Sequence, residues 1–489
     1  MGLYRLLLLL MIATGCLSLR CDAVQAQGIG SEWSTPVDIG AGEHPSREIF
    51  GALVCDQYQN VHLLWSEESD EGARIFYRTD AAGDWSAAVD VLAFSYRTAV
   101  NLQAEIDSTT DILYLSWVDN WLGGNLHYSF APLATAGDPR AWSSPRELPY
   151  PTGGASFDID QTGTIHLTFR GSESTLQPTL YYIRSEDGAL TWSAPVLVYS
   201  TFVPVSSSIG GAIAVDDAGR IHVGITVRSD EYGVFSEVGY LRSLDGGRTW
   251  GDYTTVQLMG TTFQGVAVLV PYTFGADEVH LTWHDPRRMH QWSYDGGETW
   301  SQPIEIMPLG ASFGGANALA KDSAGVLHVV VRGDISQDPF VFSAAWDGTR
   351  WMAPELIEDR EMDAHGQKLI VCQGNQLHVV YDDRLTSIGD EPTVWYSSRM
   401  VNAPHIERQS FPPSSPEPTA APTQDTPSSS VAAVVAGAPT ASIQPETGLS
   451  LVPSVAPSPL ANPMVLSLAA ALVVLASAFA FHVLQRNRR

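Results

Sequence analysis

Apolar residues between positions 33 and 400 fall into short runs that are separated by turns rich in Asp, Asn and Gly. One run is Ile165-His-Leu-Thr-Phe169, and the turn Asp216-Asp-Ala-Gly219 precedes another. No stretch of this region shows the spacing of an amphipathic helix, in which apolar positions recur roughly every three to four residues. The pattern therefore predicts β-strands joined by tight turns.

These strands belong to a long internal repeat. Tryptophans recur at intervals of 50 to 58 residues. The repeated tryptophans are Trp33, Trp85, Trp142, Trp192, Trp250, Trp300 and Trp351. A second column lies within apolar runs and consists of His62, Tyr114, His166, His222, His280, His328 and His378. Each unit predicts four short strands, which in the third unit cover residues 155–160, 164–170, 180–184 and 192–199.

Seven four-stranded sheets cannot each cover both of their faces alone, but they can when they pack around a common axis. The chain enters the repeat with a fourth-strand phrase at Trp33 and leaves after a third strand at residues 393–400. The first strand of the chain can therefore complete the last sheet and close the ring. We predict an all-β, seven-bladed β-propeller with four-stranded blades over residues 30–401.

The histidine column favours a packing role over metal binding. One histidine per unit lies in a buried strand, and Tyr114 occupies the same position in the second unit. Acidic pairs such as Asp216-Asp217 are typical of solvated turns. We therefore predict no metal site and no cofactor.

Both ends of the chain differ in composition from the repeat. Residues 1–26 have the features of a signal peptide, since Arg5 is followed by an apolar run and Val24-Gln25-Ala26 offers a cleavage site. Residues 402–462 are rich in Pro, Ser, Thr and Ala, which is typical of a disordered stalk. Residues 463–484 predict a membrane-spanning helix, and the basic residues 485–489 predict a cytoplasmic tail.

Two other ways of anchoring the chain stay open. Ala13-Thr-Gly-Cys16 loosely resembles a lipoprotein cleavage box, which would place a lipid on Cys16. Gln444-Pro-Glu-Thr-Gly448 resembles a sortase signal with its first residue changed. We rank both below the membrane-spanning helix, and expect a single-pass protein of the cell membrane with the propeller outside.

An exported chain folds where disulfides persist. Cys55 and Cys372 end the first strands of the first and last units, which are neighbours where the ring closes. We hypothesise a disulfide between them.

The net charge restricts the partners of the chain. Lys and Arg total 27 against 54 acidic residues, which gives a net charge of −27. Such a polyanion repels nucleic acid, so we expect none as a partner. The two lysines are Lys321 and Lys368, so nearly all cationic side chains are arginines, which suit bidentate recognition of carboxylates. We expect a monomer.

A short motif precedes three of the repeated tryptophans. Two full copies have the form Ser-x-Asp-x-Gly-x-Thr-Trp, and a third is close to it. Their key residues are Ser243, Asp245, Gly247 and Trp250 in the fourth unit, Ser293, Asp295, Gly297 and Trp300 in the fifth, and Ser185, Asp187 and Trp192 in the third. The motif resembles the Asp box of the BNR-repeat, sialidase-like β-propellers, and the resemblance extends over residues 33–400. In that family the box is structural and lies away from the active site.

The resemblance implies a set of candidate site residues on the opposite face. Sialidases use arginines for the substrate carboxylate, an acidic residue as acid/base, and a tyrosine nucleophile that a glutamate activates. Arg47 stands at the spacing of the first such arginine, although the Ile-Pro of the family motif is missing here. The candidate catalytic residues are Asp70 as acid/base, Tyr381 or Tyr396 as nucleophile, and Glu231 or Glu237 beside it. Further candidate arginines at or beyond second-strand ends are Arg170, Arg228, Arg332 and Arg384.

Two functions follow from the resemblance. The first is a cell-surface propeller that recognises extracellular glycans or proteins, with or without catalysis. The second is an active exo-α-sialidase-type glycoside hydrolase that removes terminal acidic sugars. The altered motif around Arg47 and the seventh unit favour recognition, because the resemblance implies six blades for a sialidase.

Overall fold

A computed structural model describes most of the repeat region. The described residues are 32–40, 51–69, 71–96, 98–119, 124–151, 154–171, 177–201, 207–229, 236–259, 269–285, 287–308, 317–335, 338–358, 364–383 and 394–411. The predicted signal peptide, nearly all of the stalk, the membrane-spanning helix and the tail lie outside them. Within the described residues, no helix is both long enough and apolar enough to cross a membrane.

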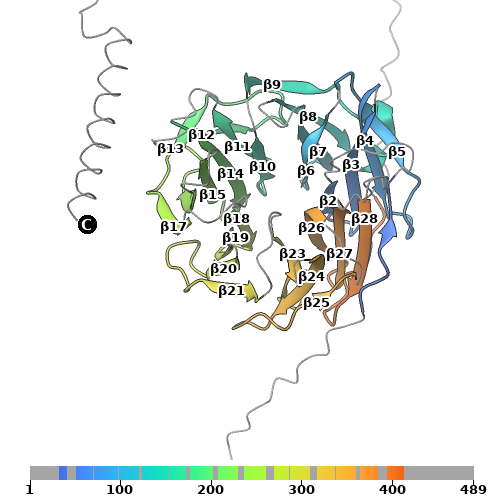
Figure 1. The fold of residues 1–489 in the computed structure, drawn as a ribbon. Helices are drawn as coiled ribbons and strands as arrows, with labels where there is room; N and C mark the ends of the chain where they lie inside the picture. Colours follow the sequence, from blue (N-terminus) through green and yellow to red (C-terminus); the bar gives the residue numbers. More distant parts are fainter. Residues whose placement is uncertain are drawn as a thin grey trace, which may run out of the picture. The chain divides into compact units, whose positions relative to one another are not determined.

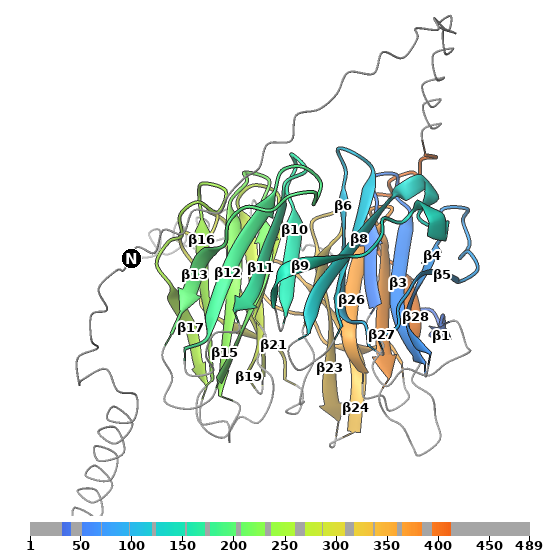
Figure 2. The same cartoon turned by 90° about the horizontal axis from the view of Figure 1, so that it is seen from above.

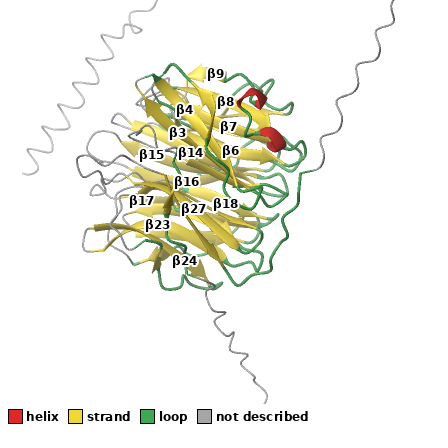
Figure 3. Ribbon diagram, turned by 90° about the vertical axis from the view of Figure 1, so that its right-hand side faces the viewer, coloured by secondary structure: helices red, strands yellow, loops and turns green. Residues whose placement is uncertain are grey.

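Seven four-stranded antiparallel sheets are arranged around a central axis (Figure 1). Their strands run side by side between the two faces of the ring (Figure 2). In the first four blades the strands are β2 (Gly51–Cys55), β3 (Val61–Ser69), β4 (Gly72–Thr79), β5 (Val89–Ala93); β6 (Val100–Asp107), β7 (Ile112–Val118), β8 (Asn125–Pro132), β9 (Arg146–Pro151); β10 (Ala155–Ile159), β11 (Ile165–Gly171), β12 (Thr179–Ser185), β13 (Val196–Ser200); β14 (Ser207–Val215), β15 (Ile221–Ser229), β16 (Ser236–Ser243) and β17 (Thr254–Met259). In the last three they are β18 (Val270–Phe274), β19 (Glu278–Asp285), β20 (Arg287–Ser293), β21 (Ile304–Met307); β22 (Ala318–Lys321), β23 (Leu327–Ile335), β24 (Asp338–Trp346), β25 (Glu355–Leu356); β26 (Ala364–Cys372), β27 (Gln376–Asp383), β28 (Val394–Met400) and β1 (Val37–Asp38). Two short 3₁₀ helices, η1 (Leu133–Thr135) and η2 (Pro139–Ala141), separate β8 from β9 (Figure 3).

The first strand of the chain closes the ring. β1 pairs with β28 through Val37 opposite Tyr396 and Asp38 opposite Trp395. The seven-bladed propeller and its mode of closure, which the phase of the repeat predicted, are therefore confirmed.

The fourth strands begin later than the sequence predicted. In the third blade the expected strand at 192–199 is β13, which starts only at Val196. Trp192 and Pro195 precede it, because the indole packs toward the neighbouring blade and a proline nitrogen cannot donate to the sheet.

Seven apolar clusters fill the space between the blades, one for each pair of neighbours. The cluster between the first and second blades contains Leu64, Ile75 and Trp117, all 0% exposed. Burial of both faces of every sheet thus depends on closing the ring, which is why the seam between the seventh and first blades matters for stability.

In several blades a buried histidine of the column links the blade to its own turn and, through a tyrosine, to the next blade. His166 is buried, with Nε2 3.1 Å from Oδ2 of Asp160 and Nδ1 2.7 Å from the hydroxyl of Tyr182. Tyr182 packs edge-on against Trp250 of the next blade, with ring centroids 5.2 Å apart. The same Asp–His–Tyr chain occurs at Asp56–His62–Tyr77 and Asp216–His222–Tyr240. The column is therefore structural, as the sequence predicted.

The Asp boxes cap the turns between third and fourth strands. In the fourth blade the carboxylate of Asp245 accepts hydrogen bonds from Ser243 and from the backbone and side chain of Thr249, at 2.6–2.9 Å. These bonds, with that of the Thr249 hydroxyl foremost, lower the pKa of Asp245 to about 2. Gly247 has φ +80°, and a Cβ there would lie 2.1 Å from the ring of Tyr182, so only glycine fits.

The seam between the seventh and first blades has two further fastenings. Cys55 and Cys372 form a disulfide with their Cα atoms 5.7 Å apart, which is the pairing hypothesised from the sequence. After β28 the chain continues across the seam, where the backbone N–H of Ile406 donates to Gln373 and that of Gln409 donates to Tyr58, at 2.8 Å each. Residues 401–411 form what we call the C-terminal strap.

Candidate functional site

The two faces of the ring differ in what they carry. The box face holds the turns within hairpins of first and second or third and fourth strands, including Asp187, Asp245 and Asp295. The loop face holds the connections between second and third strands and those between blades. Arg170 and Arg288 lie next to strand ends on this face, and Arg332 lies three residues before the end of β23.

Several candidate residues lie outside the described part of the chain. These are Arg47, Asp70, Glu231 and Arg384. The backbone of Arg228 ends β15 on the loop face, but its side chain is not described. Their predicted roles therefore stay predictions.

Arg170 and Arg332 both lie in the loop-face half of second strands, Arg170 next to the end of β11 and Arg332 three residues before the end of β23. Arg170 is half-buried at the end of β11, in the third blade. Arg332 is 8% exposed in β23, in the sixth blade, and its Nη2 lies 3.9 Å from Oδ1 of Asp334.

A second buried arginine accompanies Arg332. Arg288, at the start of β20 in the fifth blade, is 5% exposed, and its Nε donates to the backbone oxygen of Arg332 at 2.7 Å. Its Nη1 donates to Oδ1 of Asn317 at 2.8 Å, and Asn317 is itself 3% exposed. The two guanidinium-bearing residues are thus joined across the boundary between the fifth and sixth blades. We call Arg288 and Arg332 the arginine pair.

The electrostatics of the arginine pair favour an anion. Burial, followed by repulsion from Arg332, lowers the pKa of Arg288 to about 9, while Asp334 acts in the opposite direction. Arg288 is still cationic at neutral pH. Asp334 compensates part of this positive charge. Planar guanidinium groups suit carboxylate or sulfate oxygens.

Sequence reasoning missed Arg288 because it searched the ends of second strands only. A single residue, at position 286, joins β19 to β20, so the start of the third strand lies beside the end of the second. His284 of β19 is paired directly with Arg288 in the sheet. The sequence signal that could have identified Arg288 is the consecutive Arg287-Arg288 directly after this short turn.

The candidate nucleophiles lie in packed surroundings. Tyr381 is 1% exposed within the apolar cluster between the sixth and seventh blades, and its hydroxyl is buried. Tyr396 belongs to a histidine link, with its hydroxyl 2.8 Å from Nδ1 of His378, and burial raises its pKa to about 12. Neither placement favours attack on a substrate, because a nucleophile needs access to the reacting carbon and an activated hydroxyl.

Glu237 has a different partner from the one expected. Its Oε1 accepts hydrogen bonds from the hydroxyls of Tyr253 at 2.9 Å and Thr255 at 2.6 Å. Burial, then the charge of Glu237, raises the pKa of Tyr253, which opposes its ionisation. Since Glu237 stands in the fourth blade and Tyr381 in the seventh, the structure does not bring these two together.

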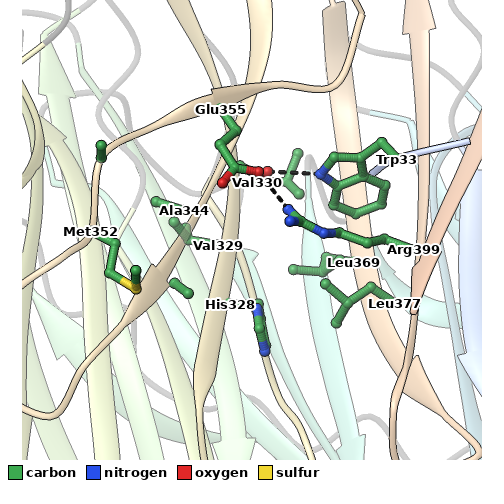
Figure 4. Close-up of a pocket in the computed structure, with 13 residues that line it drawn as sticks. Trp33, His328, Val329, Val330, Ala344, Met352, Glu355, Leu369, Leu377 and Arg399 are labelled. Carbon is green, nitrogen blue, oxygen red and sulfur yellow. Dashed lines mark hydrogen bonds and ion pairs between the residues drawn. The ribbon is translucent and has the colours of Figure 1, made fainter. Parts of the chain in front are cut away.

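A small cavity of about 10 Å³ lies between the sixth and seventh blades, close to the space that one water requires (Figure 4). Its wall includes Trp33, His328, Ser343, Glu355 and Arg399. Nη1 of Arg399 lies 2.7 Å from Oε2 of Glu355, and Nε1 of Trp33 donates to the Ser343 hydroxyl at 2.8 Å.

This cavity marks a gap in the histidine links. In the sheet His328 is paired with Ala345, and Ser343 lies two residues before that partner. Tyr182 and Tyr240 take the equivalent positions relative to His166 and His222. Nδ1 of His328 therefore lacks the phenol that the equivalent histidines bond.

Adding a phenol at Ser343 should destabilise the ring. We expect Ser343→Tyr to lower the free energy of unfolding by about 1–3 kcal/mol, because the cavity has room for about one water and not for an aromatic ring. Ser343→Ala, which removes only the hydroxyl that accepts from Nε1 of Trp33, is the matched control and should lose about 1 kcal/mol. Urea unfolding followed by tryptophan fluorescence would measure both. A Ser343→Tyr variant as stable as the wild type would show that the neighbouring side chains move aside for the ring.

No group of three or more histidine, cysteine, aspartate or glutamate residues in the described ranges could hold a metal ion. The arginine pair is the candidate site.

The chain is similar to several known proteins. The profile of the BNR repeat-like domain matches residues 152–379. No curated protein matches the sequence. Among solved structures, a leech intramolecular trans-sialidase complexed with 2,7-anhydro-Neu5Ac is 14% identical, with 76% of this chain and 71% of that chain covered and a TM-score of 0.43. A PL25 ulvan lyase bound to -[GlcA(1-4)Rha3S]- is 11% identical, with 78% and 98% covered and a TM-score of 0.49. An α-L-arabinofuranosidase from Fusarium graminearum is 10% identical, with 76% and 98% covered and a TM-score of 0.43.

Proposed function

We propose, from the premise that the chain belongs to the Asp-box (BNR-repeat) superfamily of sialidase-like propellers, that it recognises extracellular glycans through its loop face. The ligand group that the site suits best is an acidic one, a sugar carboxylate or sulfate. The observation that carries this proposal is the arginine pair, in which Arg288 and Arg332 are both more than nine-tenths buried and directly joined.

The negative net charge of the chain makes the arginine pair stronger support for an acidic ligand. The chain has a net charge of −27, so a buried concentration of positive charge runs against its average composition. Arginine forks recognise carboxylate and sulfate geometry at two points, which gives orientation as well as affinity. A protein ligand with an acidic side chain presents the same group, and is the second class of ligand within this proposal.

The surroundings of the tyrosines favour recognition of a glycan over its hydrolysis. A sialidase-type hydrolase needs a tyrosine nucleophile beside a glutamate, facing the bound sugar. One hydrogen-bonded Tyr–Glu pair in the described ranges is Tyr253 with Glu237, and the pKa of Tyr253 is raised by burial and by that carboxylate. A raised pKa disfavours the phenolate, so this pair does not supply an activated nucleophile.

The proposed location is the cell surface. The sequence supports it through the signal peptide at 1–26, the stalk at 402–462, the membrane-spanning helix at 463–484 and the basic tail at 485–489. In this arrangement the propeller is outside, the tail is cytoplasmic, and the chain acts as a monomer.

Glycan-array binding by the full chain in detergent tests the proposal. We expect binding to glycans that carry carboxylate or sulfate groups, and a decrease in affinity of about 10- to 100-fold in Arg288→Ala and in Arg332→Ala, since each removes charge-assisted hydrogen bonds. Arg350→Ala, on the box face and highly exposed, is the matched control and should bind as the wild type does.

Two outcomes would contradict the proposal. One is binding to neutral and acidic glycans alike with no effect of either arginine. The other is binding to no glycan or protein on such arrays. Release of sugar from fluorogenic sialosides would instead favour the hydrolase.

A further inference from the structure

The fourth strands form the outer edges of the blades (Figure 1). Between the third and fourth blades this edge carries two tyrosines, Tyr199 on β13 and Tyr253 directly before β17. Their rings are stacked, with centroids 4.2 Å apart and planes inclined by 25°. This separation is shorter than the roughly 4.5–7 Å that is typical of aromatic pairs, so the two phenol rings are in van der Waals contact.

The fourth blade is shaped to hold the ring of Tyr253. A Cβ at Gly239 of β16 would lie 2.2 Å from both Cζ and the hydroxyl oxygen of Tyr253, so this glycine leaves the room that the phenol occupies. The hydroxyl of Tyr253 donates to Oε1 of Glu237 at 2.9 Å, and the same oxygen accepts from the hydroxyl of Thr255 at 2.6 Å. Glu237 is 9% exposed, whereas both tyrosines are half-buried. Tyr253 therefore has both a fixed proton acceptor and a second phenol ring in contact with it.

These surroundings suit the loss of an electron from the phenols. Burial raises the pKa of Tyr199, and burial followed by the charge of Glu237 raises that of Tyr253, so both side chains are neutral phenols at neutral pH. A phenol that loses an electron becomes a strong acid. A carboxylate that already accepts its hydrogen bond can take the proton in the same step, which avoids leaving a positive charge in a half-buried place.

We propose that Tyr199 and Tyr253 are an oxidative modification site, at which one-electron oxidants such as peroxyl radicals or high-valent metal complexes form a dityrosine cross-link between the third and fourth blades. One equivalent of oxidant removes an electron from Tyr253, and the phenol proton passes to Glu237. A second equivalent oxidises Tyr199, whose proton passes to water.

The two phenoxyl radicals then join through a ring carbon next to each oxygen. The hydrogens on these two carbons leave as protons, and each oxygen takes up one proton, which restores both aromatic rings. The product has two hydrogens fewer than the two tyrosines, and two equivalents of oxidant have been reduced. Like the disulfide at the seam, this bond would persist in an oxidising compartment. The inference is independent of the proposed function.

Photo-oxidation of the full chain in detergent, with tris(bipyridine)ruthenium and persulfate, tests the proposal. Dityrosine fluorescence would follow the reaction, and peptide mass mapping would locate the cross-link. We expect the link between residues 199 and 253 to be at least about 10-fold more abundant than any other link between two tyrosines, because contact makes the coupling unimolecular. Tyr294, which is 59% exposed on the box face, is the internal control, since the oxidant reaches it more easily.

Variants separate the role of each side chain. Tyr199→Phe should abolish the cross-link, and Tyr294→Phe should leave its yield unchanged. Glu237→Gln keeps a hydrogen-bond acceptor but cannot take up the proton, so it should slow formation by about 10-fold or more, as expected for loss of a positioned base that water replaces in part. Glu298→Gln, the same change at an exposed position, should have no effect.

Two results would overturn the proposal. One is a set of cross-links at exposed tyrosines that does not include the pair of residues 199 and 253. The other is a Glu237→Gln variant that forms the cross-link at the wild-type rate. Thermal unfolding of each variant would confirm that the ring is intact, and the peptide map of the wild type tests the site without any variant.

Discussion

Acidification from pH 7 to pH 4.5 is expected to destabilise the propeller strongly, while most of its carboxylates are still ionised. Burial lowers the pKa of His378 to about 3, and lowers those of His222, His280 and His290 in the same direction. In the unfolded chain a histidine titrates near pH 6.5. The unfolded state therefore takes up protons below pH 6.5 that the folded state excludes, and stability is lost as pH falls.

The size of this effect follows from the linkage. Each fully excluded proton costs about 1.4 kcal/mol per pH unit, so His378 alone contributes roughly 3 kcal/mol between pH 6.5 and pH 4.5. The other three histidines add to it. Because domains of ordinary stability have only about 5–15 kcal/mol in total, acid should bring the ring close to unfolding.

Urea unfolding at a series of pH values would measure this dependence. His378→Tyr is the matched variant, because Tyr114 takes the equivalent position in the second blade. This variant should reduce the dependence of the free energy of unfolding on pH by about the contribution of one histidine. A midpoint that stays constant between pH 7 and pH 4.5 would contradict the buried, neutral histidines.

Removal of the disulfide is expected to lower the free energy of unfolding by about 3–5 kcal/mol, because it closes a very long loop in the unfolded chain. Cys55 and Cys372 are 317 residues apart in sequence. The ring should still form, since β1 and the C-terminal strap also bridge the seam.

Thermal and urea unfolding of Cys55→Ser/Cys372→Ser, beside the wild type with and without reductant, would test this. The reduced wild type should match the double variant, and reductant should not affect the variant. If all samples unfolded at the same denaturant concentration, the seam would not limit the stability of the ring.

The fold could be predicted from sequence because the same physical problem is solved seven times. Every blade needs an indole between sheets and a buried polar link, so the tryptophan and histidine columns repeat at positions such as Trp250 and His222. Because Trp33 belongs to a fourth-strand phrase, the sequence also predicted that the first strand of the chain closes the ring. The starts of the fourth strands were less predictable, because Trp192 lies beside a strand without being part of it.

The candidate site was harder to predict because it depends on contacts between different blades. Arg332 was found because it follows the apolar run of a second strand, but its partner Arg288 belongs to another blade and to the start of a third strand. Tyr381 lies near the end of a second strand, β27, yet its side chain lies within the apolar cluster between the sixth and seventh blades. Strand alternation decides which side a residue faces, and single-sequence patterns do not show what lies opposite.

The central claim is that the arginine pair holds the acidic group of a glycan. Its most direct test compares the affinity of the full chain for an acidic glycan identified on the array with that for the same glycan neutralised at its acid group, such as the methyl ester of a carboxylate. We predict that the wild type prefers the acid by about 10-fold or more, and that Arg288→Ala and Arg332→Ala lose most of this preference. Equal affinity of the wild type for the acid and its neutral counterpart would contradict the account.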